Sequence, residues 1–343
     1  MFKPKYIINN DILFNIKRIA ELVTELNNRN LPKIVLLKLI KKANEISAFS
    51  STSIEGNPLP LSEVKKILKT KPEHIRDTEK EVLNYNQALV KLNKLIEKKD
   101  KTFNLSLILD IHKLVMQDLI QKYRCGKLRT EPVFVNNPKI HKTVYWPPDH
   151  HDVPESMNRL IEFVNKNKDK IDPLILAGIF HKQFVIIHPF MDGNGRTVRL
   201  ATKILLANMG LNTFNLFSFE NYYNKNIDKY FNNVGELNNY YDIENKIDFT
   251  SWLTYFTDGI IDELLRVGKE LKQQNITPNE QLSEHQEKII KYMKKHGYIT
   301  DRLYSKITDR AKPTRHLDFK DLIERGIIEM HGKARATYYK LKN

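Results

Sequence analysis

The sequence predicts a mainly α-helical protein that also carries two small β-hairpins. Ahead of Gly56, apolar residues recur at helical spacing, namely Val35, Leu36, Leu39, Ala43, Ile46 and Phe49. The same spacing follows Thr197, at Val198, Leu200, Ala201, Ile204 and Leu205. Two short β-prone runs, at 126–135 and 144–148, flank a polar stretch that contains proline, and a second alternating pattern surrounds Gly332. We therefore expect a helical framework to which each hairpin is added.

Length and composition set the outer limits. A chain of 343 residues is long enough for two or three domains. We expect an N-terminal helical region over 1–85, a core over 86–275 and a C-terminal module over 276–343. No apolar run approaches the length that spans a membrane, and the N-terminus lacks the apolar region of a signal peptide. The single cysteine, Cys125, excludes an internal disulfide and indicates a reducing cytoplasm.

Residues 188–199 combine the groups that a nucleoside triphosphate and a divalent metal require. His188 can accept a proton near neutral pH. Asp192 supplies one carboxylate, and proteins usually hold Mg²⁺ with one or two carboxylates while substrate phosphates fill other positions. The segment therefore predicts a general base next to a magnesium ligand.

The rest of this segment is suited to binding phosphate. Gly193 and Gly195 allow a tight turn that brings backbone N–H groups close to an anion. Because a helix follows, the turn lies at a helix N-terminus, where free N–H groups and the dipole favour phosphate. Arg196 and Arg199 are three residues apart and share one helical face, so both can contact one polyphosphate. A plain turn with a buried histidine is the alternative, but all these residues in this order favour the phosphate site.

The segment resembles the signature of the Fic family, His-Pro-Phe-x-Asp/Glu-Gly-Asn-Gly-Arg-x-x-Arg, at every defined position. This resemblance implies a helical enzyme that transfers AMP from ATP to a protein hydroxyl and releases pyrophosphate. By position, His188 would deprotonate the attacking Ser, Thr or Tyr, and Asp192 would hold Mg²⁺ between the α- and β-phosphates. Protein catalysis of such a displacement consists mostly of positioning and charge stabilisation.

The resemblance also implies the phosphate-binding residues. Arg196 would bind the α- and β-phosphates, Arg199 would bind the γ-phosphate, and the anion hole would consist of Gly193, Asn194 and Gly195. Relatives that transfer another phosphate-containing group tend to carry lysine where this chain has Gly195, so AMP is favoured over that alternative. A DNA-binding regulator that uses the core as a nucleotide sensor is a second alternative. His188 argues against it, because sensing requires the phosphate contacts but no base.

A second motif lies upstream, at residues 51–58. Gly56 followed by Pro58 ends the preceding helix, so Glu55 lies in its last turn, where the dipole disfavours an anion by about 0.3–1 kcal/mol. An ordinary exposed glutamate is the plain interpretation. Ser51 and Glu55, however, fit the inhibitory pattern Ser/Thr-x-x-x-Glu-Gly/Asn of many Fic proteins. There the glutamate pairs with the second signature arginine, here Arg199, and takes the place of the γ-phosphate. In some relatives it also supports the reverse reaction, and the sequence leaves this open.

Two further segments resemble substrate-binding parts of the family. The β-prone runs at 126–135 and 144–148 resemble the flap, a hairpin that pairs with the main chain of the target protein. A hairpin that only packs on the core is compatible with the same residues. Residues 221–239 predict a polar helix with aromatic residues, and the resemblance gives Phe231 and Asn238 to the adenine pocket. Phe231 would keep the stacking of a tyrosine but lose its hydroxyl.

The C-terminal part is basic and has its own pattern. The formal net charge of the chain is +15, and residues 281–343 carry 15 basic and 8 acidic residues. After a polar linker at 272–279, helices are expected near 284–295, 301–307 and 313–324, followed by a hairpin around Gly332. This order resembles a winged helix-turn-helix, in which the third helix contacts duplex DNA. The candidate contact residues are Thr314, Arg315, His316 and Lys320. A docking module with a solvated basic hairpin is the alternative, and nothing in the sequence determines an oligomeric state.

Overall fold

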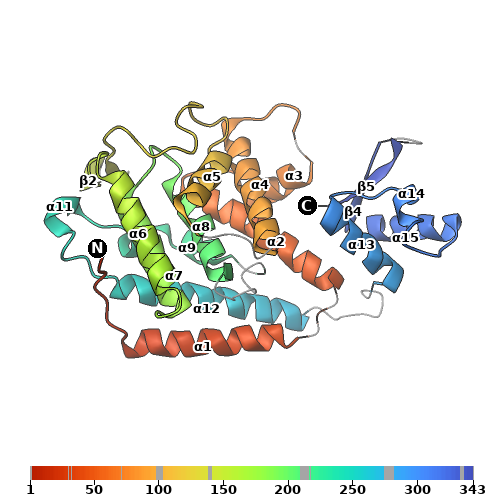
Figure 1. Ribbon diagram of the computed structural model, residues 1–343, viewed down its shortest axis with the longest axis horizontal. Coiled ribbons are helices and arrows are strands. Elements are labelled where there is room, and N and C mark those ends of the chain that lie inside the picture. Colours follow the sequence, from red (N-terminus) through yellow and green to blue (C-terminus); the bar gives the residue numbers. More distant parts are fainter. Residues whose placement is uncertain are drawn as a thin grey trace. The chain divides into compact units, whose positions relative to one another are not determined.

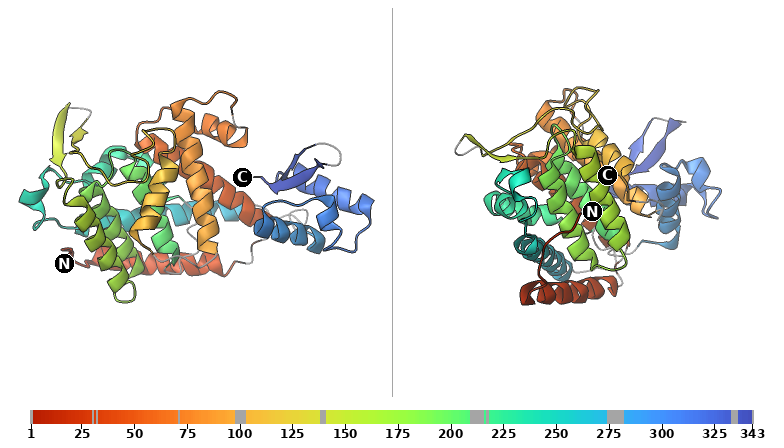
Figure 2. Two further views of the ribbon diagram at one scale, coloured as in Figure 1. Left: turned by 45° about the horizontal axis from the view of Figure 1, so that its top comes forward. Right: turned by 60° about the vertical axis from the view of Figure 1, so that its left-hand side comes forward.

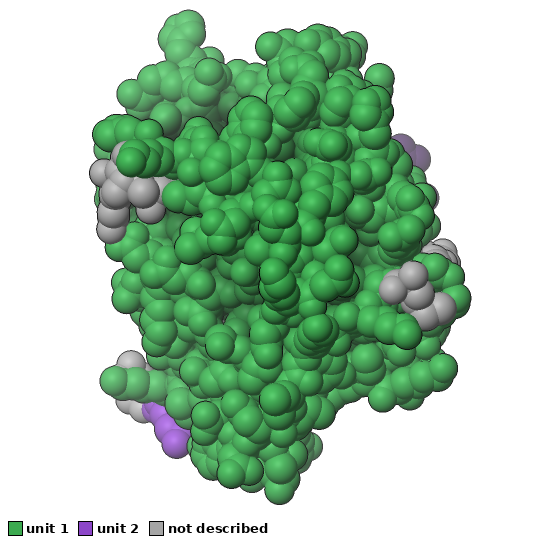
Figure 3. All heavy atoms as spheres, turned by 90° about the vertical axis from the view of Figure 1, so that its left-hand side faces the viewer, with its two compact units in different colours: residues 1–29, 42–271 green, residues 30–41, 272–343 purple. Residues whose placement is uncertain are grey.

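The computed structural model describes residues 2–29, 31, 33–70, 72–97, 103–137, 141–208, 216, 218–273, 282–332 and 336–342. The chain folds mainly into helices, as predicted (Figure 1). It divides into two compact units, one made of residues 1–29 and 42–271 and the other of residues 30–41 and 272–343 (Figure 3). The predicted N-terminal region, 1–85, and the predicted core, 86–275, therefore fall largely within one compact unit and not in two. Within the described ranges, no helix is long and apolar enough to cross a membrane.

Helices make up most of the first unit. They are α1 (Asn10–Asn27), α2 (Lys33–Ile54, whose first residues belong to the other unit), α3 (Leu61–Lys69), α4 (Asp77–Glu97), α5 (Leu105–Val115), α6 (Val153–Asn167), α7 (Pro173–Ile187), α8 (Asn194–Asn208), α9 (Phe219–Lys225), α10 (Ile227–Val234), α11 (Tyr240–Ile243) and α12 (Thr250–Gln273). Helices α1 and α12 lie side by side (Figure 2), and the buried Asn15 amide donates to Thr257 and Asp258 on α12.

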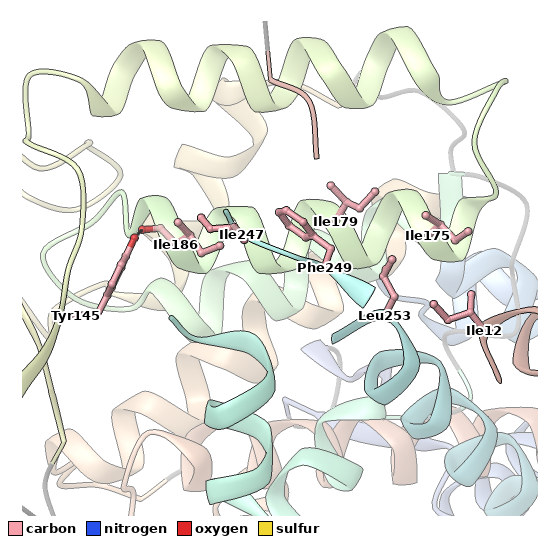
Figure 4. Packing of buried hydrophobic residues seen from close by; sticks show 8 residues of the cluster. All are labelled: Ile12, Tyr145, Ile175, Ile179, Ile186, Ile247, Phe249 and Leu253. Carbon is pink, nitrogen blue, oxygen red and sulfur yellow. Dashed lines mark hydrogen bonds between the residues drawn. The ribbon is translucent and has the colours of Figure 1, made fainter. Parts of the chain in front are cut away.

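Helix α7 lies at the centre of the first unit and is buried along nearly its whole length. Its sequence is predominantly apolar apart from residues 181–183, which is typical of a helix surrounded by other elements. Asp172 caps its first turn by accepting from the Leu174 N–H at 2.8 Å. Figure 4 shows Ile175, Ile179 and Ile186 spaced along this helix, with Ile175 nearest Leu253 of α12 and Ile186 beside Ile247, towards Tyr145. This rigid helix ends directly before His188, so the core determines where the candidate base lies.

A hairpin forms in the region of the predicted flap, but its first strand begins only at Val135, the last residue of the predicted run 126–135. Strand β1 (Val135–Asn137) pairs antiparallel with β2 (Lys142–Trp146), which also pairs in parallel with the short β3 (Asn238–Asn239). The single helix predicted over 221–239 was wrong in its extent. The Asn226 side chain accepts from the Lys229 N–H and starts α10 as a new helix after α9, and α10 ends at Val234 with Gly235 as its C-cap. The backbone of Asn238 is then part of the sheet.

The second unit contains the elements expected of the C-terminal part. They are α13 (Glu284–His296), α14 (Asp301–Tyr304), α15 (Lys312–Glu324), β4 (Ile328–His331) and β5 (Tyr338–Leu341). Ser283 and Gln286 form a capping box at the start of α13. Phe319 of α15 stacks on Tyr339 of β5 with ring centroids 4.0 Å apart, which joins the helices to the hairpin. Most of the predicted linker, the predicted boundary at 276 and the basic hairpin tip at 333–335 lie outside the described residues.

Candidate active site at the turn between α7 and α8

His188 ends α7 in a left-handed backbone conformation, with φ of 51°. Its N–H donates to the Phe184 carbonyl at 3.0 Å, which closes the last helical turn. Its ring Nδ1 lies 3.4 Å from the Val185 carbonyl oxygen, and because a carbonyl can only accept, Nδ1 carries the proton. Burial lowers the pKa of His188 to about 4, so the ring is neutral at pH 7. Nε2 is therefore the nitrogen that can accept a proton.

Arg129 holds this turn from the side of the flap. Its buried guanidinium donates through Nε to the His188 carbonyl at 2.9 Å and through a terminal nitrogen to the Pro148 carbonyl. Its backbone N–H donates to the Pro189 carbonyl at 2.9 Å. This role of Arg129 could not be predicted from the sequence, because 59 residues separate it from His188 and no local pattern links the two.

His112 of α5 is a second positioning residue that the sequence did not reveal. Its Nδ1 accepts from the Gly126 N–H at 2.9 Å, so its Nε2 carries the proton and donates to the Asp192 carbonyl at 3.0 Å. Burial lowers the pKa of His112 to about 4, which keeps this tautomer neutral. The ring also stacks on Phe190, with centroids 3.8 Å apart and planes 6° from parallel. The loop is thus fixed at two neighbouring points.

The loop before α8 has the shape of an anion-binding turn. Asn194 closes it, since its side chain accepts from the Phe190 N–H and donates to the Phe190 carbonyl, both at 2.9 Å. Gly193 has φ of +76°, and a β-carbon there would lie 2.5 Å from the Met116 sulfur. Because α8 begins at Asn194, the N–H groups of its first turn have no partners within the helix. They are available to an anion in front of the turn.

Arg196 and Asp192 lie together at the edge of this turn. Arg196 is 3% exposed, and one terminal nitrogen donates to Asp192 Oδ1 at 3.0 Å. Its other terminal nitrogen lies 3.2 Å from a carboxylate oxygen of Glu81, and neither that nitrogen nor Nε makes a hydrogen bond within the described part of the chain. A buried guanidinium with unused donors is suited to a phosphate.

Asp192 could hold a metal only together with a ligand. Its side chain is 57% exposed, and no group of three or more His, Cys, Asp or Glu side chains among the described residues could hold a metal ion. A single carboxylate beside a phosphate site nevertheless fits Mg²⁺, because this ion takes much of its shell from waters and substrate phosphates. The residues present are therefore compatible with a magnesium–nucleotide complex.

The end of α2 brings Glu55 to this site. Helix α2 ends in a Schellman motif, in which the Gly56 N–H donates to the Ser53 carbonyl at 2.9 Å and the Asn57 N–H to the Thr52 carbonyl at 3.1 Å. Gly56 adopts φ of +93°, which glycine does without strain. The predicted helix end is confirmed, and it directs the Glu55 side chain towards α8.

Ser51, Glu55 and Arg199 meet as predicted. Arg199 is fully buried, and it donates through Nε to the Ser51 hydroxyl, and through one terminal nitrogen to the Ser51 carbonyl, both at 2.8 Å. The same terminal nitrogen donates to Glu55 Oε1 at 2.7 Å. Burial alone would lower the pKa of Arg199, but the Glu55 carboxylate raises it above its ordinary value. A β-carbon at Gly195 would lie 2.1 Å from Glu55 Oε1, so the carboxylate lies directly against the turn.

The two residues predicted for the adenine pocket lie on different elements. Phe231 is on α10 and is 46% exposed. Asn238 is in β3, has φ of 72° and pairs with Tyr145 of the flap strand β2. Their role in binding adenine stays a prediction.

Comparison with known proteins identifies the domain that carries this site. Residues 102–206 match the Fic/DOC family. The protein adenylyltransferase Fic of Nematostella vectensis is 30% identical over 177 residues, which cover 50% of this chain and 40% of that protein. Protein adenylyltransferase fic-1 of Caenorhabditis elegans is 28% identical over 181 residues, which cover 51% of this chain and 34% of that protein. The chain thus contains a Fic domain, and it spans less than half the length of these relatives.

Solved structures show the same fold. A Fic family protein from Desulfovibrio desulfuricans G20 superposes with a TM-score of 0.65 and 19% identity, over 99% of this chain and 98% of that one. A fragment of Fic-1 from C. elegans, residues 134–508, superposes with a TM-score of 0.59 and 22% identity, over 76% of this chain and 73% of that one. At these identities the likeness concerns the fold.

Proposed function

We propose that this chain is a protein adenylyltransferase that transfers AMP from ATP to a Ser, Thr or Tyr hydroxyl of a target protein and of itself. The observation that carries the proposal is the neutral His188 in the same short turn as Arg196, whose Nε and one terminal nitrogen make no hydrogen bond among the described residues. A base and an anion site at adjacent positions are what an attack on a phosphate ester requires. The names of the relatives support the same activity.

The reaction is a displacement at the α-phosphorus. Nε2 of His188 takes the proton of the target hydroxyl while the hydroxyl oxygen forms the new bond to the α-phosphorus. The bond between the α-phosphorus and the bridging oxygen breaks, and pyrophosphate leaves. The N–H groups of the α8 turn together with Arg196 and Arg199 stabilise the charge on the phosphate oxygens. Asp192 would hold Mg²⁺, which neutralises part of the phosphate charge when bound.

Two alternatives have less support. A nucleotide sensor does not need a general base. The His188 ring, however, is neutral at pH 7, and Arg129 holds the His188 backbone through its carbonyl, as a base requires. Transfer of another phosphate-containing group is disfavoured by Gly195, since Glu55 already lies where a longer side chain would have to fit.

The unmodified chain is proposed to be autoinhibited by Glu55. The carboxylate bonds Arg199 and lies against Gly195, where the γ-phosphate of ATP is proposed to bind. The flap hairpin of β1 and β2 is proposed to receive the target main chain, and Phe231 and Asn238 to contact adenine. The single cysteine supports a cytoplasmic location.

The activity is tested in a Glu55→Gly background, where the proposed competitor is absent. This variant and Glu55→Gly/His188→Ala are incubated with ATP labelled at the α-phosphate and with a native lysate. We expect labelled protein only with His188 present, while both variants bind ATP with similar affinity because the phosphate donors remain. Equal labelling by the two variants would exclude His188 as the base.

We further propose that residues 276–343 are a winged-helix module that binds duplex DNA. The structure changes which residues of α15 are candidates. Arg315 makes two hydrogen bonds to Asp301, at 2.8 and 2.9 Å, and a third to the Arg310 carbonyl, so its donors are used within the unit. Lys312, His316 and Lys320 are exposed at four-residue intervals and share one face of the helix.

A mobility-shift assay at several salt concentrations tests this surface. Lys312→Ala/Lys320→Ala should weaken binding and reduce the salt dependence, because two phosphate contacts are lost. The control Lys291→Ala/Lys295→Ala removes the same charge from exposed positions of α13. No shift of the parent at low salt, or equal losses in both pairs, would favour the docking module.

A further inference from the structure

Helices α2 and α8 face each other through a polar seam with a regular register. Ser51 contacts Arg199, and one turn further along α2 the Glu55 carboxylate lies against Gly195. One turn back along α2, the Ser47 hydroxyl accepts a hydrogen bond from Lys203. Each step is four residues on both helices, in opposite directions. The inhibitory contact is therefore the end of a longer antiparallel seam.

The far end of this seam is a buried ion pair. Lys203 Nζ lies 2.9 Å from Glu220 Oε1, and these residues are 6% and 0% exposed. The Ser47 hydroxyl donates to the same carboxylate oxygen at 2.9 Å, as does the Tyr85 hydroxyl at 2.8 Å, while Ser218 donates to the other oxygen at 2.7 Å. Burial would raise the pKa of Glu220, but Lys203 and the Ser218 hydroxyl lower it below its ordinary value, so the carboxylate stays ionised.

We propose that Ser47 is a positioning residue for Glu55, which it holds against Gly195 by tying α2 to the Lys203–Glu220 pair. The inference rests on the proposed function, in which Glu55 competes with ATP. Ser47 and Glu55 are two turns apart, roughly 12 Å along the helix axis, and a helix transmits a constraint over that distance as a rigid rod. Ser47 is the α2 residue in this charged cluster, while the other members come from α4, α8, and the start of α9.

Lys203 and Glu220 keep other hydrogen-bond and ion-pair partners when Ser47 is replaced. Without the hydroxyl, Lys203 and Glu220 still contact each other, and Glu220 keeps Tyr85 and Ser218. What is lost is one of the polar contacts between α2 and the rest of the domain, while the two hydrogen bonds between Ser51 and Arg199 remain. The docked state of α2 then loses free energy relative to the undocked state, and the site at Gly195 becomes more accessible to ATP.

The chain contains a matched control for this serine. Ser50 lies on the same helix and is as fully buried as Ser47, both 0% exposed, but its hydroxyl has no hydrogen-bond partner in the described structure. Changing either serine to alanine removes the same atom from a buried position of α2. Only the change at Ser47 breaks hydrogen bonds to charged groups, which contribute more than bonds between neutral groups.

The test measures affinity for a non-hydrolysable ATP analogue with Mg²⁺ by calorimetry. The proteins are the parent, Ser47→Ala, Ser50→Ala, and the same two changes in a Glu55→Gly background. We expect Ser47→Ala to tighten binding about tenfold, which corresponds to about 1.4 kcal/mol. Ser50→Ala should leave the affinity of the parent unchanged. In the Glu55→Gly background neither serine change should alter binding, because no carboxylate remains to be positioned.

The possible outcomes separate the inference from the function on which it rests. If Glu55→Gly tightens binding and Ser47→Ala does not, Glu55 competes with ATP but Ser47 does not position it. If Ser47→Ala changes affinity equally with and without Glu55, it acts on the site by another route, and the inference is wrong. If Glu55→Gly itself binds no tighter than the parent, both proposals are overturned. A misfolded variant would lose affinity, so a gain cannot arise from poor folding.

Discussion

Replacing Glu55 by glycine should convert the chain into a form that modifies itself with AMP. The change removes the carboxylate that bonds Arg199 and lies against Gly195, and it leaves the guanidinium in place. A hydrogen bond between charged groups contributes about 1.5–3 kcal/mol. Because the Glu55 side chain is 26% exposed, water and salt weaken its interaction, and the lower part of this range applies. Productive ATP binding should then improve about 10- to 30-fold.

The assay is intact-protein mass spectrometry after incubation with saturating Mg²⁺ and ATP. Glu55→Gly should show one or more mass increments of AMP, whereas the parent shows little. Adding Arg199→Ala should reverse this gain, because the γ-phosphate then has no partner. Glu55→Gln is a graded control, since it keeps the size of the side chain but removes its charge. Equal modification of parent and Glu55→Gly under these conditions would make Glu55 an ordinary surface residue and refute the proposed autoinhibition.

Two further predictions concern the framework of the site. Gly193→Ala should destabilise the protein by about 1–3 kcal/mol, because φ is +76° and the new methyl would lie 2.5 Å from the Met116 sulfur. Gly268→Ala in α12, where a β-carbon meets nothing within 4 Å, should instead raise the melting temperature, so equal effects of the two changes would contradict the packing argument. Burial lowers the pKa values of both His112 and His181, so the unfolded chain binds more protons between about pH 4 and 6.5 and stability should fall on acidification through that window. Denaturant unfolding at pH 7 and pH 5 should show this loss, by up to about 1.4 kcal/mol per pH unit for each histidine, and His112→Gln should flatten the dependence.

The parts of the site that could be predicted from sequence are those that are continuous in the chain. The turn before α8 is one such segment. Ser51 of α2 and Glu55 at the end of this helix are another, because they are four residues apart and therefore lie on the same face. Arg129 and His112 were missed because their contacts with the turn span 59 and 80 residues, and nothing near them in sequence indicates a partner. The single polar helix predicted over 221–239 failed for a local reason, since the Asn226 side chain caps a second helix within the predicted range.

The two arginines at this turn have N–H donors without hydrogen-bond partners among the described residues, and these donors determine how the site responds to an anion. Arg199 has one terminal nitrogen without a hydrogen-bond partner, and Arg196 has two nitrogens without one within the described structure. Buried donors left unpaired cost free energy that an anion can recover. Glu55 accepts a hydrogen bond at the Arg199 end, whereas the Glu81 carboxylate lies 3.2 Å from a terminal nitrogen of Arg196 without forming a hydrogen bond to it. Displacing a single side chain therefore completes an anion site that is otherwise already formed, so the contacts that hold α2 in register, at Ser47 and Ser51, determine how readily ATP can take its place.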